Sequence, residues 1–407
     1  MNSHQRQPGD WFARLVLASV FLIPIQIPLG GLFRIAPSDL LICAAIPLGI
    51  RRVSIAPRSG LLGPFLFPIV MLWGLVLSAL VSNRVLSHAV FVKTAGAAVL
   101  LVSLLFWQQV ARESDEGFTR LIRAFLIGSF VFTVAGLVEW VIGTSHVSER
   151  FIESRFAGAY YDPNHYGSLT VVALLLLSAT HRKIFAKRWV SPVIAGVLLL
   201  GLLLSASRGA WIGLVLGAGL VVWYRPPPRL PAKVVAAGAG ALLVLLLSGF
   251  VGRVLEDISD RPDNVDHRTS LMEEGIERLE ASRFVGIGLS VFLDDNEIII
   301  HNSAVWLVVE MGLVGLVVYL LFVGEPTVRL LECRRRSRTR EVAELAAALL
   351  AAHLAMAFSS LTVEATYQRQ WWFVLALTIA LSSRLNAVET ESPPDQDADA
   401  SPIQPAP

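Results

Sequence analysis

Three arginines and a histidine are the residues of this chain best suited to chemistry. Arg208 separates two apolar runs in Ser-Ala-Ser-Arg-Gly-Ala-Trp, and Arg268 and Arg155 lie in two longer polar stretches. His301 opens a later apolar run in Ile-Ile-Ile-His-Asn-Ser. A guanidinium binds phosphate oxygens through a bidentate fork, and an imidazole with an ordinary pKa of about 6.5 accepts protons at neutral pH. These residue types predict a diphosphate-binding site beside a proton acceptor.

Neighbouring polar groups could support such a site. Asn302 follows the histidine, and Asp162, Pro163 and Asn164 form a turn signal in the earlier polar stretch. Taken singly, each has an ordinary structural explanation, such as a snorkelling arginine or a solvated loop. Those explanations do not account for all of these groups falling on one predicted side of a membrane.

The predicted chemistry is glycosyl transfer, if the diphosphate joins a sugar to a polyprenyl chain. Diphosphate is a good leaving group that arginines can neutralise, so the prediction includes no metal and no cofactor. A metal site is not favoured, because the first outer loop contains a single acidic residue, Asp39. The acidic residues Asp294, Asp295 and Glu297 have no histidine or cysteine at transition-metal spacing. Gly286-Ile-Gly288 lacks the third glycine of a dinucleotide fingerprint.

The elements that must position these groups are membrane helices. Of 407 residues, 54% are apolar and 16% charged, against about 25% charged in soluble domains, and the mean hydropathy is +0.62. This composition excludes a soluble enzyme, a nucleic-acid-binding protein and a secreted disulfide scaffold. We predict an all-α, polytopic membrane protein with about 12 transmembrane helices, near residues 11–30, 36–50, 61–82, 88–110, 119–143, 165–180, 189–206, 209–224, 234–252, 300–324, 343–362 and 371–387.

The distribution of Lys and Arg predicts the orientation. With a cytoplasmic N-terminus, 22 of the 34 basic residues fall on the cytoplasmic side and 11 on the other, and Lys93 lies inside a span. Both termini are therefore expected in the cytoplasm, with a membrane domain over 1–387 that includes a large periplasmic loop over 253–299. Residues 388–407 read as a disordered cytoplasmic tail.

The large loop is expected to contain a helix on the outer surface. Leu271, Ile276 and Leu279 share roughly one helical face, and Ser270 with Glu273 could form a capping box. A lid over the site and a solvated linker helix both remain open.

Several short motifs, in one order, resemble the O-antigen ligase and O-antigen polymerase superfamily of bacterial envelope glycosyltransferases. The resemblance covers about residues 150–325. It is carried by Asp162 to Asn164, Ser207 to Gly209, Arg268, Gly286, Gly288, His301, Asn302, Glu310, Gly312 and Gly315.

The resemblance implies an inverting enzyme of lipopolysaccharide biosynthesis in the bacterial inner membrane, working at the periplasmic face on undecaprenyl-diphosphate-linked glycan. Arg208 and Arg268 would hold the diphosphate and His301 would activate the acceptor hydroxyl, without metal or nucleotide. Arg155 matches no family arginine. The expected partners are this donor, a lipid A core or glycan acceptor, and membrane lipids, with no nucleic acid.

Other functions stay open. A ligase would use a lipid A core as acceptor and is preferred, a polymerase would use another lipid-linked repeat unit, and transfer to protein is a third option. A multi-span transporter would instead depend on Glu310, His353 and Lys93, which are polar groups within spans. Glu310 is expected to pair with another helix, with His353 as a candidate partner.

Overall fold

The computed structural model describes residues 10–30, 33–53, 61–83, 87–142, 155–160, 162–224, 262–296 and 298–391. Helices dominate these residues. They are α1 (Trp11–Phe21), α2 (Pro37–Gly49), α3 (Gly63–Val81), α4 (His88–Glu113), α5 (Asp115–Ile142), α6 (Pro163–Ile184), α7 (Val190–Ser205), α8 (Arg208–Tyr224), α11 (Pro262–Ala281), α12 (Val291–Asn296), α13 (Ser303–Arg336), α14 (Arg340–Ser359) and α15 (Arg369–Glu391).

The apolar helices support a multi-pass membrane protein. Within the described residues, five helices are long and apolar enough to cross a membrane: α3, α4, α5, α13 and α14. The helices α1, α2, α7 and α8 are apolar but shorter. The helical class is confirmed, whereas the predicted number of about twelve spans is not. The predicted span 234–252 and most of the predicted tail lie outside the described residues.

The first predicted span, residues 11–30, is wrong. The helix α1 ends at Phe21, and the chain continues into β1 (Ile27–Gly30), which pairs antiparallel with β2 (Phe33–Ile35). Pro24 and Pro28 lack the amide hydrogen that a helix interior requires, so the apolar run cannot continue as one helix. The predicted all-α architecture therefore has one short hairpin added.

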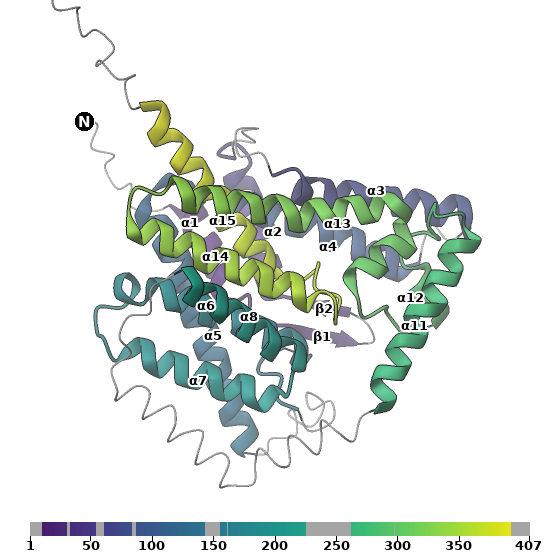
Figure 1. Cartoon of the computed structure of the whole chain (residues 1–407), viewed down its shortest axis with the longest axis horizontal. Coiled ribbons are helices and arrows are strands. Elements are labelled where there is room, and N and C mark those ends of the chain that lie inside the picture. Colours follow the sequence, from purple (N-terminus) through teal and green to yellow (C-terminus); the bar gives the residue numbers. More distant parts are fainter. Residues whose placement is uncertain are drawn as a thin grey trace, which may run out of the picture.

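The helices form a bundle with two distinct ends (Figure 1). The α13 helix packs against α3 and α14, and α14 packs in turn against α6 and α8. We call the end where α6, α8 and α13 begin the histidine end, and the end where α14 begins the opposite end. Figure 1 shows α11 and α12 at the histidine end, across the tips of α3 and α13.

A break in α13 receives the linker between α11 and α12. Gly312 leaves helical geometry with φ 68° and ψ −158°. The amide of Ile287 donates to the carbonyl of Val309 at 3.0 Å, and the amide of Gly288 donates to that of Glu310 at 2.9 Å. A Cβ on Gly286, whose φ is +103°, would lie 2.6 Å from the backbone nitrogen of Gly312. The Gly-x-Gly motif and Gly312 are therefore required by close backbone contact.

The predicted surface helix exists, but its start and its buried face differ from the prediction. α11 begins at Pro262, so Ser270 lies inside the helix and not at its N-cap. Leu271 and Leu279 are buried, whereas Ile276 is 43% exposed. A Cβ on Gly275 would come within 3.2 Å of the Val309 side chain, so α11 approaches α13 closely along this face.

Candidate functional site

The loop between α14 and α15, residues 360–368, organises the histidine end. The amide of Ser303 donates to the carbonyl of Ser360 at 2.7 Å. The Ser303 hydroxyl donates to the carbonyl of Val363 at 3.1 Å and accepts from the amide of Ala365 at 2.9 Å. These three bonds hold the first residue of α13 against the α14–α15 loop. Because His301 lies two residues earlier, its position is tied to the same loop.

The same loop contacts the elements that carry the two predicted diphosphate-binding arginines. Arg268 of α11 donates from Nη1 to the carbonyl of Thr362 at 3.1 Å. A Cβ on Gly209 would lie 2.7 Å from the hydroxyl oxygen of Thr362, so the start of α8 also lies against this residue. Arg208 precedes Gly209 and is exposed at the first position of α8. A helix N-terminus favours bound anions, so the start of α8 and the guanidinium of Arg208 would attract the same negatively charged ligand.

Arg155 holds two helix ends together. Its Nη2 donates to Oδ1 of Asn164 at 2.8 Å, and its Nε donates to the carbonyl of Ser205 at 2.9 Å. The hydroxyl of Ser207 donates to the same Asn164 oxygen at 3.1 Å. Arg155 and Asn164 thereby join the start of α6 to the turn that precedes Arg208, which gives both residues a structural role. Diphosphate binding by Arg155 stays a prediction.

Asp162 caps α6 and stays ionised. Its Oδ1 accepts the amide of Asn164 at 2.7 Å. Burial raises the pKa of Asp162, but the nearby His165, the amide of Asn164 and the guanidinium of Arg155 outweigh it and hold that pKa below its usual value. The supporting role predicted for Asp162 therefore includes a fixed negative charge near the site.

His301 lies near titratable groups of α6, α11 and the α14–α15 loop. Burial lowers its pKa below the usual value, and the positive charge of Arg268 lowers it further. Asp162 and Glu364 act in the opposite direction, and His165 adds a small lowering effect. His301 is therefore neutral near pH 7, which is the form that accepts a proton.

Asn302 acts as the N-cap of α13. Its Oδ1 accepts the amides of Ala304 at 3.0 Å and Val305 at 3.1 Å. Both amides are otherwise unsatisfied at a helix start, so the side chain stabilises the beginning of α13. Asn302 supports the site by fixing the helix that follows His301.

The sequence analysis missed the α14–α15 loop and its carboxylate. Glu364 lies 3.3 Å from Nζ of Lys93, and this ammonium lies 4.0 Å from the centre of the Trp306 ring. The available signal was the polar segment Thr-Val-Glu-Ala-Thr, which directly follows a predicted span on the outer side. A lysine within a span and a glutamate beside another span are natural partners, because each is costly alone in a membrane.

The suggested pairing of Glu310 with His353 is wrong. The carboxylate of Glu310 accepts the amide of Ser290 at 2.8 Å. His353 contacts the carbonyl of Val323 at 2.9 Å and accepts from the indole of Trp371 at 3.0 Å. Both residues stabilise local structure: Glu310 holds the segment that enters the α13 break, and His353 joins α13, α14 and α15.

The acidic residues of the large loop form ion pairs with arginine. Asp295 accepts from Arg278 at 2.6 Å, and the same guanidinium contacts Glu274 at 2.6 Å. Among the residues that the structure describes, no group of three or more His, Cys, Asp or Glu is placed to hold a metal ion.

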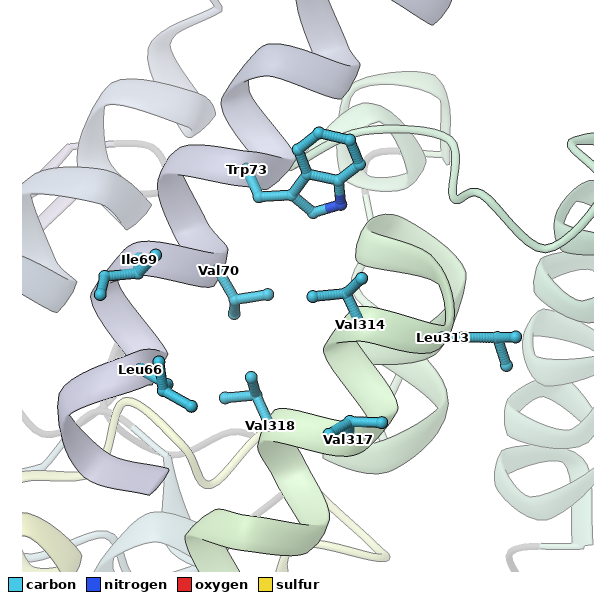
Figure 2. A pocket seen from close by; sticks show the side chains of 8 residues that line it. All are labelled: Leu66, Ile69, Val70, Trp73, Leu313, Val314, Val317 and Val318. Atoms are coloured by element: carbon cyan, nitrogen blue, oxygen red, sulfur yellow. The ribbon is translucent and has the colours of Figure 1, made fainter. Parts of the chain in front are cut away.

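An apolar groove runs between α3 and α13 (Figure 2). Its volume is about 390 Å³, and its lining comprises Leu66, Ile69, Val70, Trp73, Leu313, Val314, Val317 and Val318. No polar lining surface is present. All four lining residues from α13 follow the break at Gly312. A Cβ on Gly315 would lie 2.1 Å from the carbonyl oxygen of Leu307, so the two parts of α13 pack closely against each other at this break.

Comparison with known families gives one match. Residues 193–320 match the family model described as O-antigen ligase. This range contains Arg208, Arg268 and His301. The match confirms the superfamily predicted from the sequence. No curated protein matches the chain.

Proposed function

The chain carries an O-antigen ligase region at residues 193–320, and on this premise we propose that it transfers glycan from undecaprenyl diphosphate to a hydroxyl of a lipid A core. The reaction would take place at the periplasmic face of the bacterial inner membrane and would invert the anomeric carbon. The family implies a lipid-linked glycan as substrate. Neutralisation of the diphosphate by arginines would make a metal unnecessary.

One observation supports this function above the others. The α14–α15 loop bonds to Ser303, next to His301, and to Arg268, and it lies against Gly209, next to Arg208. Residues separated by about a hundred positions in the chain thus gather around one loop. A diphosphate needs several positive groups and the reaction needs a base beside them, and this cluster supplies both kinds of group.

The proposed step follows from these groups. The acceptor hydroxyl attacks the anomeric carbon and gives its proton to the neutral imidazole of His301. The bond between that carbon and the diphosphate oxygen breaks, and Arg208 and Arg268 stabilise the departing negative charge. Since Arg268 lowers the pKa of His301, a bound diphosphate that offsets this positive charge would make His301 a stronger base. Donor binding would therefore prepare the base for the acceptor.

We assign the polyprenyl chain of the donor to the groove between α3 and α13. The groove is wholly apolar and is lined by α3 and by the part of α13 that follows the break at Gly312. A donor whose diphosphate binds in the polar cluster would place its polyprenyl chain in this groove.

The deciding experiment is reconstitution. Purified protein is mixed with undecaprenyl-diphosphate-linked glycan and lipid A core in the presence of a chelator, and the products are separated on a gel. We expect glycan on the core without added metal or nucleotide. The His301→Ala variant should form no product, while Lys183→Ala, at the opposite end, should retain activity. Size exclusion and thermal melting establish that both variants are folded.

Other products would contradict the ligase proposal. Longer glycan that remains on polyprenyl diphosphate identifies a polymerase. Transfer to neither acceptor, together with uptake of a solute that Lys93→Ala abolishes, identifies a transporter.

A labelling experiment tests the proposed orientation. Glu277 is exposed on α11, so a cysteine placed there in a Cys43→Ser, Cys333→Ser background should react with an impermeant maleimide outside intact inner membranes. A cysteine at Lys183 should react only after permeabilisation. The reverse pattern would overturn the periplasmic assignment.

A further inference from the structure

The pair formed by Lys93 and Glu364 is the most deeply buried ion pair at the histidine end of the described structure. The Lys93 and Glu364 side chains are 10% and 11% exposed, and their charged atoms are 3.3 Å apart. Removing two charges from water costs several kcal/mol per ion in general, so a buried pair is weak evidence for a purely stabilising role. A pair in such a place within a membrane protein is instead a candidate for function.

The position of Glu364 is fixed relative to His301. The hydroxyl of Ser303 donates to the carbonyl of Val363, the residue before Glu364. It accepts from the amide of Ala365, the residue after Glu364. The buried hydroxyl of Ser303 thus holds the backbone on both sides of Glu364. Ser303 lies two residues after His301. The backbone of Glu364 cannot move away from the start of α13 without breaking these bonds, and the ion pair with Lys93 holds its carboxylate.

Lys93 is also held in place. Its ammonium lies 4.0 Å from the centre of the Trp306 ring, about one helical turn after His301. The hydroxyl of Tyr367, three residues after Glu364, donates to the backbone carbonyl of Lys93 at 3.0 Å. The α14–α15 loop, α4 and α13 therefore hold the ion pair in a single geometry.

We propose that Glu364 is a positioning residue for the transfer reaction: its carboxylate, held by the ion pair with Lys93, stabilises the imidazolium of His301 after proton uptake. The inference rests on the proposed function. The acceptor proton moves to His301 and goes no further in this step, so Glu364 gains no proton. Its role is electrostatic and resembles that of a carboxylate behind a catalytic histidine in general.

The groups around His301 explain why a second carboxylate is useful. Burial, Arg268 and His165 all disfavour a positive charge on His301, while Asp162 and Glu364 favour it. Asp162 also accepts a backbone amide and is close to Arg155. Glu364 reaches the site from a different element, and its partner Lys93 lies in α4. The two carboxylates therefore act on His301 from independent positions.

The test uses the full-length protein with Glu364→Gln, which keeps the shape and removes the charge. We expect the kcat of transfer to fall by about 10- to 100-fold, as expected for loss of one charged interaction, with little change in the donor KM. The acidic limb of the pH profile of kcat/KM should move to lower pH, because Glu364 raises the pKa of His301. Glu364→Asp should recover part of the rate.

Tyr367→Phe is the matched control. It removes the hydroxyl that donates to Lys93 and leaves both charges in place. We expect no movement of its acidic limb, even if the protein melts at a lower temperature. A rate loss in Glu364→Gln with an unmoved acidic limb would overturn the proposal and leave a structural role only.

A second measurement does not depend on turnover. NMR of protein labelled with ¹³C-histidine, with the His301 signal assigned through His301→Ala, gives the pKa of His301 directly. Glu364→Gln should lower that pKa. An unchanged pKa overturns this inference alone, whereas absence of any transfer by the unmodified protein overturns the proposed function and the inference together.

Discussion

The two ends of the bundle use the same charged residue types in different ways. At the opposite end, a cavity of about 640 Å³ is lined by both charged and apolar side chains. Lys183 pairs there with Glu341, and Arg384 pairs with Asp115. At the histidine end, Arg155 and Arg268 donate to backbone carbonyls of helix ends and loops.

The difference between the ends lies in what the cations do. The Lys183 and Glu341 side chains are 59% and 66% exposed, so their mutual attraction is screened by water and contributes about 1 kcal/mol or less. At the histidine end, Arg155 and Arg268 bond to backbone carbonyls, and Arg268 lies near His301. Exposed charges at the opposite end thus pair with each other, whereas we propose that Arg208 and Arg268 at the histidine end bind a ligand.

The largest expected effect is on Arg268. Arg268→Ala should reduce kcat/KM for glycan transfer by about 100- to 1,000-fold, because it removes a positive group that stabilises the departing diphosphate. The assay is the reconstitution with lipid-linked donor. Arg268→Lys should recover little, since an ammonium lacks the bidentate fork. A loss in kcat/KM of less than about threefold is far below the effect of one charge-stabilising group. It would contradict the proposal that the histidine end, unlike the opposite end, binds the diphosphate.

The next effect is a shift of the pH profile. Arg268 lowers the pKa of His301, so Arg268→Gln should raise that pKa and move the acidic limb of kcat/KM to higher pH. The residual activity of the variant is measured from pH 5 to pH 8 with long incubations. In the unmodified protein, this limb should lie below the usual pKa of a histidine, about 6.5. A limb that stays in place would mean that another group controls the profile.

A smaller effect is expected in the groove. Val317→Trp should narrow the groove and raise the KM for a full-length polyprenyl donor by about three- to tenfold, which corresponds to the loss of one or two buried methylene contacts. A donor with a short prenyl chain should show no such increase. Val328→Trp, an exposed position further along α13 outside the groove lining, is the control. Equal effects on both donors would reject the chain assignment.

The smallest effect belongs to the opposite end. Lys183→Ala and Glu341→Ala should each change transfer by less than about twofold and lower the melting temperature little, since they break an exposed pair. The double variant should behave like either single variant. A strong loss of transfer would show that the opposite end also takes part in the reaction.

The sequence predicted the helical membrane class, because apolar runs are local signals. Isolated charges indicated Arg208, Arg268 and His301, and their roles in the reaction stay predictions. It placed most helices correctly, from 61–82, observed as α3, to 371–387, observed within α15. It failed at residues 11–30, where prolines ended the helix within an apolar run. The buried face of α11 was also partly misjudged, since α13 approaches α11 at Gly275 and Ile276 stays exposed while Leu271 and Leu279 are buried.

The organising role of the α14–α15 loop could not be predicted. Thr362 and Ser303 are ordinary residues in the sequence, and their importance comes from contacts over about 60 to 150 positions. The same holds for Lys93, whose partner Glu364 is far along the chain. Such contacts depend on how helices pack, which one sequence does not specify locally.

The break in α13 also constrains how the chain can vary in length. The open carbonyls of Val309 and Glu310 receive amides from Ile287 and Gly288. A single residue added to or deleted from that connection would shift every amide past its acceptor, and polar backbone left unsatisfied in an apolar surrounding costs several kcal/mol per group. Natural insertions near this site should therefore accumulate elsewhere, while the spacing from Phe284 to Ser290 stays constant.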